Sequence, residues 1–509
     1  MAGWLSIRAA VLLVAGAISA YGQQGGTVAD SARAERSSKE PKEELRVTTH
    51  RVRIAGEEIV YRATAGTLLL KEEDGKPKAS IFFIAYEKQG VTDPRTRPLT
   101  FSFNGGPGSS SVWLHLGLLG PRRVLLDDEG NPPPPPYRLV NNEYSLLDVT
   151  DLVFIDPVTT GYSRAVPGED PRQFHGVDED VVWVGEFIRL YTTRFMRWAS
   201  PKFLIGESYG TTRAAALAGH LQERHGMYLN GIMLISAILN FQTANFAVGN
   251  DLPYILFLPS YTATAWYHRR LPPELQSDLV VALRRAEGFA MGTYATALMK
   301  GDALTEAETG AVADSVAMLT GLSEVYVRQS NLRIAMARFV KELLRLERRT
   351  VGRLDSRFKG IDRDAAGERY EFDPSYAAIQ GPFTATLNDY VRRELKFESD
   401  LPYEILTGRV SPWNYAPYQN RYLNVAETLR KAMSMNPYLR VFVACGLYDL
   451  ATPYFAAKYT VEHMELDPSL RGNITVRCYE AGHMMYIHKP SLVALKEDLA
   501  SFVRNAIQQ

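Results

Sequence analysis

Gly206-Glu207-Ser208-Tyr209-Gly210 is the most informative stretch of this 509-residue sequence. Residues 202–205 before it form a short run of strand type, and residues 211–220 after it are rich in alanine and favour a helix. A strand, a sharp turn that carries a serine, and a helix together expose the hydroxyl and direct the helix N-terminus towards it. A side chain on either flank of so sharp a turn would clash, which explains the two glycines. We therefore predict that Ser208 is a nucleophile.

A serine hydroxyl does not ionise near neutral pH, so it needs a base, and the base needs an orienting acid. The apolar run 441–445 is followed by Asp449, and the strand-like run 474–479 is followed by His483. The order Ser, Asp, His, with each residue just past a strand, is the order of the α/β-hydrolase fold. The sequence thus predicts an α/β fold with a central, mostly parallel sheet and a Ser208–Asp449–His483 triad.

Each partner has a rival in the sequence. His488 lies close to His483, but His483 is preferred because Gly482 frees the backbone beside it. Asp449 is preferred over Asp467, which lies in a polar loop before a proline.

A glycine-rich run, Asn104-Gly105-Gly106-Pro107-Gly108, follows the predicted strand 99–103. A phosphate-binding loop of the P-loop kind would need a Lys followed by Ser or Thr, which is missing here, and the dinucleotide-binding pattern is absent as well. We interpret the run as part of an oxyanion hole. The backbone amides of Gly106 and of Tyr209, the residue after the nucleophile, would donate to the developing oxyanion.

These motifs together resemble the serine carboxypeptidase family: Asn-Gly-Gly-Pro-Gly, Gly-Glu-Ser-Tyr-Gly, an Asp after a strand, and Gly-His-Met near the C-terminus. The resemblance covers about 75–240 and 425–505. It implies the same triad and oxyanion donors. It further implies that Asn104 and a protonated Glu207 hold the substrate's terminal carboxylate, which would explain selectivity for chain ends.

Three positions depart from the family's pattern. Ser102 stands where the family has a Trp, Ser109 stands where it has a Cys, and Leu118 stands where many members have a second acid. Because of these departures, the expected carboxylate site has fewer of the family's usual side chains, whereas the triad is unaffected.

Composition excludes several function classes. The 57 basic residues balance the 57 acidic ones, so no charge excess favours nucleic acid or a strongly charged partner. There is no metal motif of the H-E-x-x-H kind and no cofactor signature, so we expect neither a metal nor a cofactor.

The chain divides into four segments by pattern. Residues 1–22 read as a secretory signal peptide whose apolar run is too short to span a membrane, and residues 23–45 as a flexible leader. Residues 46–241 and 421–509 are the expected hydrolase core, which begins with antiparallel strands around a turn at Glu73-Asp74-Gly75. Residues 242–420 are the expected helical cap, with helical spacing at 275–286 and 306–319 and a capping box at Thr305 and Glu308.

The two cysteines, Cys445 and Cys478, are few for a secreted protein. They are expected on neighbouring strands, where pairing is an alternative, but a bridge between adjacent parallel strands is geometrically awkward. We interpret them as buried thiols.

The leading functional hypothesis is a secreted or periplasmic serine carboxypeptidase that acts on peptides with a free C-terminus. An acyltransferase or esterase with the same triad is the alternative, because water and an acceptor alcohol compete for one acyl-enzyme. A catalytically silent binding protein is the third hypothesis. The family resemblance also makes a homodimer possible.

Overall fold

The computed structural model describes residues 42–508, so the predicted signal peptide and most of the predicted leader lie outside the described residues. Within them a ten-stranded sheet has the order β1-β2-β3-β7-β4-β9-β10-β13-β14, with β8 paired to β3. The strands are β1 (Leu45–Ile54), β2 (Glu57–Lys71), β3 (Pro77–Lys88), β4 (Leu99–Phe103), β7 (Asp151–Ile155), β8 (Arg164–Ala165), β9 (Lys202–Glu207), β10 (Gly231–Ile235), β13 (Arg440–Gly446) and β14 (Ile474–Tyr479).

The sheet combines an antiparallel and a parallel half. Strands β1, β2 and β3 pair antiparallel, and the turn between β2 and β3 lies at the predicted Glu73-Asp74-Gly75. Strands β7, β4, β9, β10, β13 and β14 all run parallel. The predicted sheet, mostly parallel at its centre, is thus observed. The parallel strands β4, β7, β9 and β10 are buried along their whole length, as expected for a sheet covered on both faces.

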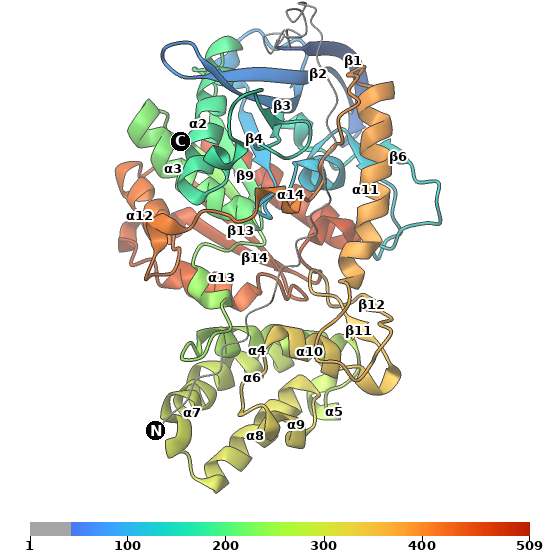
Figure 1. Ribbon diagram of the computed structural model, residues 1–509, viewed down its shortest axis with the longest axis vertical. Helices are drawn as coiled ribbons and strands as arrows, with labels where there is room; N and C mark the ends of the chain where they lie inside the picture. Colours follow the sequence, from blue (N-terminus) through green and yellow to red (C-terminus); the bar gives the residue numbers. More distant parts are fainter. Residues whose placement is uncertain (1–41, 509) are drawn as a thin grey trace, which may run out of the picture. The chain divides into compact units, whose positions relative to one another are not determined.

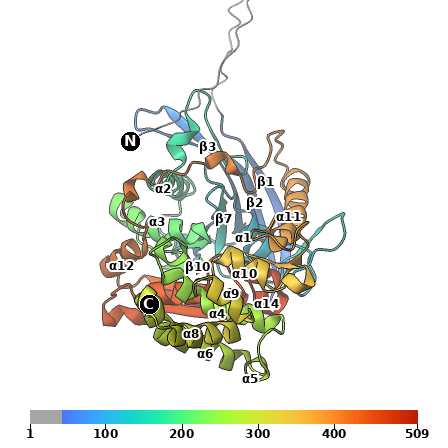
Figure 2. The ribbon, with the colours of Figure 1, turned by 60° about the horizontal axis from the view of Figure 1, so that its bottom comes forward.

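Helices cover both faces of the sheet, and the side chains alternate between the two faces along each strand. Phe83 and Leu204 pack with α2 (Val177–Arg194) and α3 (Tyr209–His225) in one core cluster. Phe82 and Phe203, one residue away in each strand, pack in a second cluster with α11 (Pro374–Arg393) and α14 (Lys489–Ile507). Figure 1 shows α2 and α3, with α12 (Ala426–Met435), on one side of the sheet and α11 on the other, and the turned view in Figure 2 agrees.

Parallel register brings the predicted site residues to one edge of the sheet. Phe103 pairs with Gly206, and Ile235 pairs with both Glu207 and Ala444. Because these strands end at the same level, Asn104, Ser208 and Asp449 follow strand ends that lie side by side. This edge is where ligands bind in open α/β sheets.

Helices α4 to α10 lie together at one end of the ribbon in Figure 1, and their buried side chains belong to the same core cluster as Phe83 and Leu204 of the sheet. They are α4 (Leu252–Tyr267), α5 (Pro273–Gln276), α6 (Leu279–Phe289), α7 (Ala295–Lys300), α8 (Glu306–Thr320), α9 (Glu324–Gln329) and α10 (Met336–Glu342). The capping box predicted at Thr305 and Glu308 is present at the start of α8. The helix expected over 275–286 is instead two helices, because the Asp278 side chain accepts from the backbone of Val280 and Val281 and begins α6.

The division into core and cap remains a prediction. Helix α11 lies inside the predicted insertion 242–420, yet its residues Phe383 and Leu387 pack with the sheet and with α14. The helix therefore belongs to the core by its contacts, and α4 to α10 are the helices that a cap would comprise.

The cysteine interpretation is wrong in one respect. Cys445 on β13 is opposite Cys478 on β14, and both are free thiols, but only Cys445 is buried while Cys478 is exposed. Strand β14 is the last strand of the sheet, so one of its sides has no neighbouring strand to cover it.

A buried ion pair connects the two helices beside the site to the glycine loop. Asp180 on α2 accepts from Arg213 Nε on α3 at 2.6 Å, and Arg213 also donates to the backbone carbonyl of Asn104 at 2.6 Å. The side chains of Arg213 and Asp180 are 1% and 3% exposed, so neither charge has water as an alternative partner.

We predict that Arg213→Met lowers the free energy of unfolding by about 3 to 5 kcal/mol, because it leaves Asp180 buried without its partner. Arg189→Met, which breaks a partly exposed pair with Glu186, is the matched control and should change stability by at most about 1 kcal/mol. Denaturant titration of both variants measures the difference. Equal losses of unfolding free energy in the two variants would mean that the buried Asp180–Arg213 pair contributes no more to stability than the partly exposed pair.

Candidate active site

Ser208 lies in the turn between β9 and α3, and its backbone has φ 59° and ψ −129°. This positive φ is rare for a residue with a side chain. The turn is possible because Gly206 and Gly210 approach each other: a Cβ on Gly206 would lie 2.1 Å from the carbonyl oxygen of Gly210. Ser208 is half-buried while Glu207 and Tyr209 are buried, so the strained turn presents the serine to the adjoining cavity.

The glycine loop after β4 packs directly on this turn. A Cβ on Gly105 would lie 2.4 Å from the backbone nitrogen of Tyr209, and one on Gly210 would lie 2.8 Å from the carbonyl oxygen of Phe103. Gly106 has φ +105°, a conformation that favours glycine. The loop that carries Gly106 is therefore in backbone contact with the turn that carries Tyr209, and the role of their amides as oxyanion donors stays a prediction.

Asp449 and His483 meet in the structure. Asp449 Oδ2 accepts from His483 Nδ1 at 2.7 Å and from the Thr452 hydroxyl at 2.7 Å. Its other oxygen accepts from the backbone amides of Ala451 and Thr452 at 2.7 and 3.0 Å. These hydrogen bonds hold the carboxylate in one orientation, with His483 directed by its Nδ1 so that Nε2 remains available for another partner.

The backbone of His483 is also held on both sides. Its amide donates to the carbonyl of Leu354 at 2.6 Å, and its carbonyl accepts from the Ser236 hydroxyl at 2.6 Å. Burial by itself would lower the pKa of His483, but the Asp449 carboxylate and, to a smaller extent, Glu207 outweigh it, so the pKa is raised above its ordinary value.

Glu207 is fully enclosed beside the nucleophile. Burial raises its pKa to about 7, although His483 and a hydrogen bond from Tyr486 act in the opposite direction. Tyr486 Oη donates to Glu207 Oε2 at 2.5 Å. Asn104 lies next to it: its Oδ1 accepts from the Leu114 amide at 3.1 Å, and its side chain faces Glu207 closely enough to act against the rise in the pKa of that carboxyl, although its buried Nδ2 makes no hydrogen bond of normal length with any described residue.

A cavity of about 290 Å³ joins these groups. Asn104, Glu207, Ser208 and His483 line it, so the structure brings together the predicted nucleophile, base and carboxylate-binding residues; Asp449 lies behind His483. The glycine loop contributes further residues to the wall, including Gly106, a predicted oxyanion donor. Other lining residues were not singled out by sequence reasoning: Trp113, Arg353, Leu354, Tyr370, Asp373, Tyr376 and Ile379.

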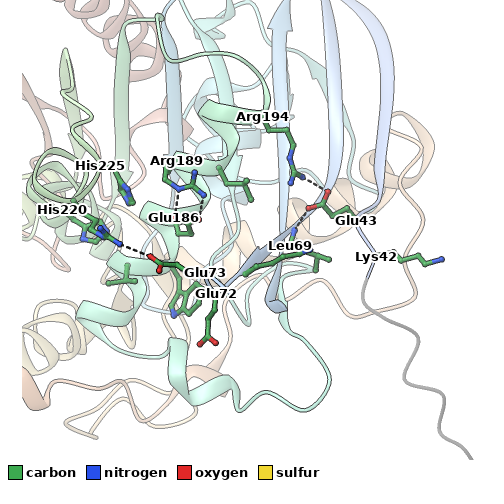
Figure 3. A pocket seen from close by; sticks show the side chains of 15 residues that line it. Lys42, Glu43, Leu69, Glu72, Glu73, Glu186, Arg189, Arg194, His220 and His225 are labelled. Atoms are coloured by element: carbon green, nitrogen blue, oxygen red, sulfur yellow. Dashed lines mark hydrogen bonds and ion pairs between the residues drawn. The ribbon is translucent and has the colours of Figure 1, made fainter. Parts of the chain in front are cut away.

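A larger cavity of about 760 Å³ lies elsewhere, between the end of β2 and helices α2 and α3 (Figure 3). None of the predicted site residues lines it. Its charged side chains are largely paired with one another, as Arg189 is with Glu186 and Arg194 with Glu43. It therefore offers no nucleophile with a base, and the smaller cavity is the candidate active site.

The two rival residues, His488 and Asp467, have partners outside the triad. His488 Nδ1 contacts the Ser491 hydroxyl at 2.8 Å, at the start of α14, and Asp467 begins a short helix by accepting from the Ser469 amide. Two supporting residues were missed. Thr452 is close to Asp449 in the sequence and Tyr486 is close to His483, but only the folded loops reveal that they contact Asp449 and Glu207.

Comparisons with known proteins identify the class and then the family. The fold matches the crystal structure of Kex1(delta)p, a prohormone-processing carboxypeptidase from Saccharomyces cerevisiae, with a TM-score of 0.55 over 87% of this chain and 91% of that one at 17% identity. The predicted α/β-hydrolase fold is thereby confirmed. A family model described as serine carboxypeptidase matches residues 62–477, so the chain belongs to the serine carboxypeptidase family.

Curated relatives agree with this assignment. Serine carboxypeptidase-like 33 from Arabidopsis thaliana is 30% identical over 34% of this chain and 33% of its own length. Carboxypeptidase Y homolog A from Phaeosphaeria nodorum is 28% identical over 27% of this chain and 23% of its own length. The matched stretches thus span about a third or less of these relatives.

We predict that Glu207→Gln stabilises the protein in a pH-dependent way. The pKa of Glu207 is about 7 in the folded protein and 4.5 ordinarily, so ionisation of Glu207 opposes folding. This cost grows as the pH rises from 4.5 to 7 and stays at about 3 kcal/mol above pH 7. Gln cannot ionise. The variant should therefore match the wild type at pH 4 and exceed its Tm at pH 8.

The control is Glu497→Gln, which alters an exposed carboxylate on α14 that has no ion pair among the described residues. Thermal unfolding at the two pH values gives the comparison. A Tm difference between Glu207→Gln and wild type that is the same at pH 4 and pH 8 would contradict a raised pKa at Glu207.

Proposed function

We propose that this protein is a serine carboxypeptidase that removes C-terminal residues from peptides through an acyl-enzyme on Ser208. The observation that carries the proposal is the unpaired, buried amide of Asn104 next to Glu207, in the same cavity as Ser208 and His483. A donor without a partner in a buried site is unfavourable unless a ligand supplies the acceptor. A terminal carboxylate supplies one acceptor for Asn104 and another for protonated Glu207.

The chemistry follows from the roles of the triad. His483 Nε2 takes the proton of the Ser208 hydroxyl, and Oγ attacks the carbonyl carbon of the last peptide bond. The backbone amides of Gly106 and Tyr209 donate to the oxyanion that forms. His483 then gives its proton to the leaving amine, and water attacks the acyl-enzyme with His483 again as base. Asp449 keeps the imidazole oriented and stabilises its charged form.

We further propose export of the protein, as a secreted or periplasmic enzyme, on the basis of the signal-like residues 1–22. Among the described residues no helix combines the length and the apolar character needed to cross a bilayer. A homodimer is proposed from the family resemblance alone.

Ser208→Ala and His483→Ala should each reduce kcat/KM by a factor on the order of 10⁴ or more without unfolding the protein, because nucleophile and base act as one unit. His488→Ala is the control and should retain activity, since His488 contacts Ser491. Hydrolysis of an N-blocked dipeptide and circular dichroism provide the two measurements. A loss with His488→Ala and not with His483→Ala would transfer the role of base to His488.

A fluorophosphonate probe tests the nucleophile independently of any substrate. It should label the wild type and leave Ser208→Ala unlabelled, whereas a catalytically silent binding protein would not react in either form.

Peptides with a free C-terminus should be cleaved far faster than the same peptides with a C-terminal amide. Asn104→Asp tests the origin of this preference, because the new side chain keeps the acceptor for Leu114 and replaces the Nδ2 donor by a negative charge. We expect a loss of roughly 100-fold in kcat/KM on the free acid, with little change on the amide. Equal rates of the wild type on both substrates would indicate an esterase or endopeptidase instead.

A further inference from the structure

The cavity beside Ser208 holds a cation that the mechanism above does not use. Arg353 lines this cavity and is half-buried, yet its guanidinium makes no hydrogen bond or ion pair with any residue from 42 to 508. Arg357, four residues further along, shows the usual alternative: it binds both oxygens of Asp355. A guanidinium that is partly removed from water and lacks an acceptor is suited to receive an anion from outside the protein.

The backbone around Arg353 is fixed by the two loops that carry Asp449 and His483. The carbonyl of Arg353 accepts from the Leu450 amide at 3.0 Å, and the next residue, Leu354, accepts from the His483 amide. Arg353 is therefore placed in the cavity by the same segment that holds the His483 backbone. The positive charge of Arg353 also acts on the predicted base, because it opposes protonation of His483 and so lowers the pKa of that residue.

One carboxylate in the same wall is already occupied. Asp373 accepts from the backbone amides of Arg353 and Leu354, both at 3.1 Å, and from the Ser375 amide at 3.0 Å at the start of α11. This carboxylate thus begins a helix and satisfies three amides, and it makes no ion pair with the Arg353 guanidinium. Apolar and aromatic side chains line the same cavity: Leu354, Tyr370, Tyr376 and Ile379.

We propose that Arg353 binds the side-chain carboxylate of the substrate's last residue, so that the enzyme prefers peptides ending in Asp or Glu. The inference rests on the proposed function, in which Asn104 and Glu207 hold the α-carboxylate. A residue held there has its side chain in this cavity, where the apolar wall contacts its methylene groups and Arg353 receives its charge.

The test compares N-blocked dipeptides that end in Glu and in Gln, which have the same shape and differ in charge. At pH 6.5 the wild type should have a kcat/KM about 10- to 100-fold higher for Glu than for Gln. Arg353→Met should reduce this ratio to about 1 by losing activity on Glu alone. Arg353→Lys keeps the charge without the planar fork and should retain part of the preference.

Arg285→Met is the matched control, because Arg285 is an exposed arginine of α6 that lies outside the cavity and has no ion pair among the described residues. The ratio of kcat/KM for the Glu dipeptide to that for the Gln dipeptide should be the same in Arg285→Met as in the wild type. Normal turnover of both dipeptides without a preference for Glu would overturn this inference and leave the proposed function intact. An equal loss on Glu and Gln in Arg353→Met would also overturn it, and would assign Arg353 to the α-carboxylate. No hydrolysis of either dipeptide by the wild type would overturn the proposed function and this inference with it.

Discussion

The contact between two backbones, the turn at Ser208 and the glycine loop after β4, is the constraint on which the rest of the site depends. A Cβ at Gly105 or Gly210 would lie within 2.8 Å of backbone atoms of the facing segment, and one at Gly206 would lie 2.1 Å from the Gly210 carbonyl oxygen within the same turn. Backbone atoms cannot move aside as the end of a flexible side chain can. Only glycine at these positions lets the two backbones approach so closely, and Ser208 keeps its positive φ because α3 and β9 hold both ends of the turn.

Buried charges around this contact divide into those that stabilise the fold and those that are left for a ligand. The Asp180–Arg213 pair is complete, and Arg213 uses a further donor on the Asn104 carbonyl, so it positions the glycine loop without offering anything to a substrate. The Nδ2 group of Asn104 and the Arg353 guanidinium differ, because both residues line the cavity and neither group makes a hydrogen bond with a described residue. Glu207 in the same wall is an acid whose pKa burial raises to about 7. Such incomplete pairing is unfavourable for folding, and functional sites are where proteins tolerate it.

The elements that carry the site could be predicted because their signals are local. Strands β4 and β14 coincide with the predicted runs 99–103 and 474–479, and β9 and β13 differ from theirs by at most two residues at either end. Tyr486 and Arg353 could not be predicted as parts of the site, because each depends on which loop the folded chain brings next to Glu207 or His483. The start of α6 has a local cause in Asp278, whose side chain caps the helix, but a prediction based on helical spacing alone does not take capping residues into account.

The charges of the cavity also explain how an anionic substrate can bind next to a base that must stay neutral. A carboxylate brought close to His483 would by itself favour the protonated imidazole, which cannot accept the Ser208 proton. If Glu207 takes up a proton as the carboxylate binds, one anion replaces another, and the negative charge near His483 does not increase. Arg353 offers the same compensation for a second carboxylate, since its cation already opposes protonation of His483. Under the proposed function, a free C-terminus would then bind without disabling the base.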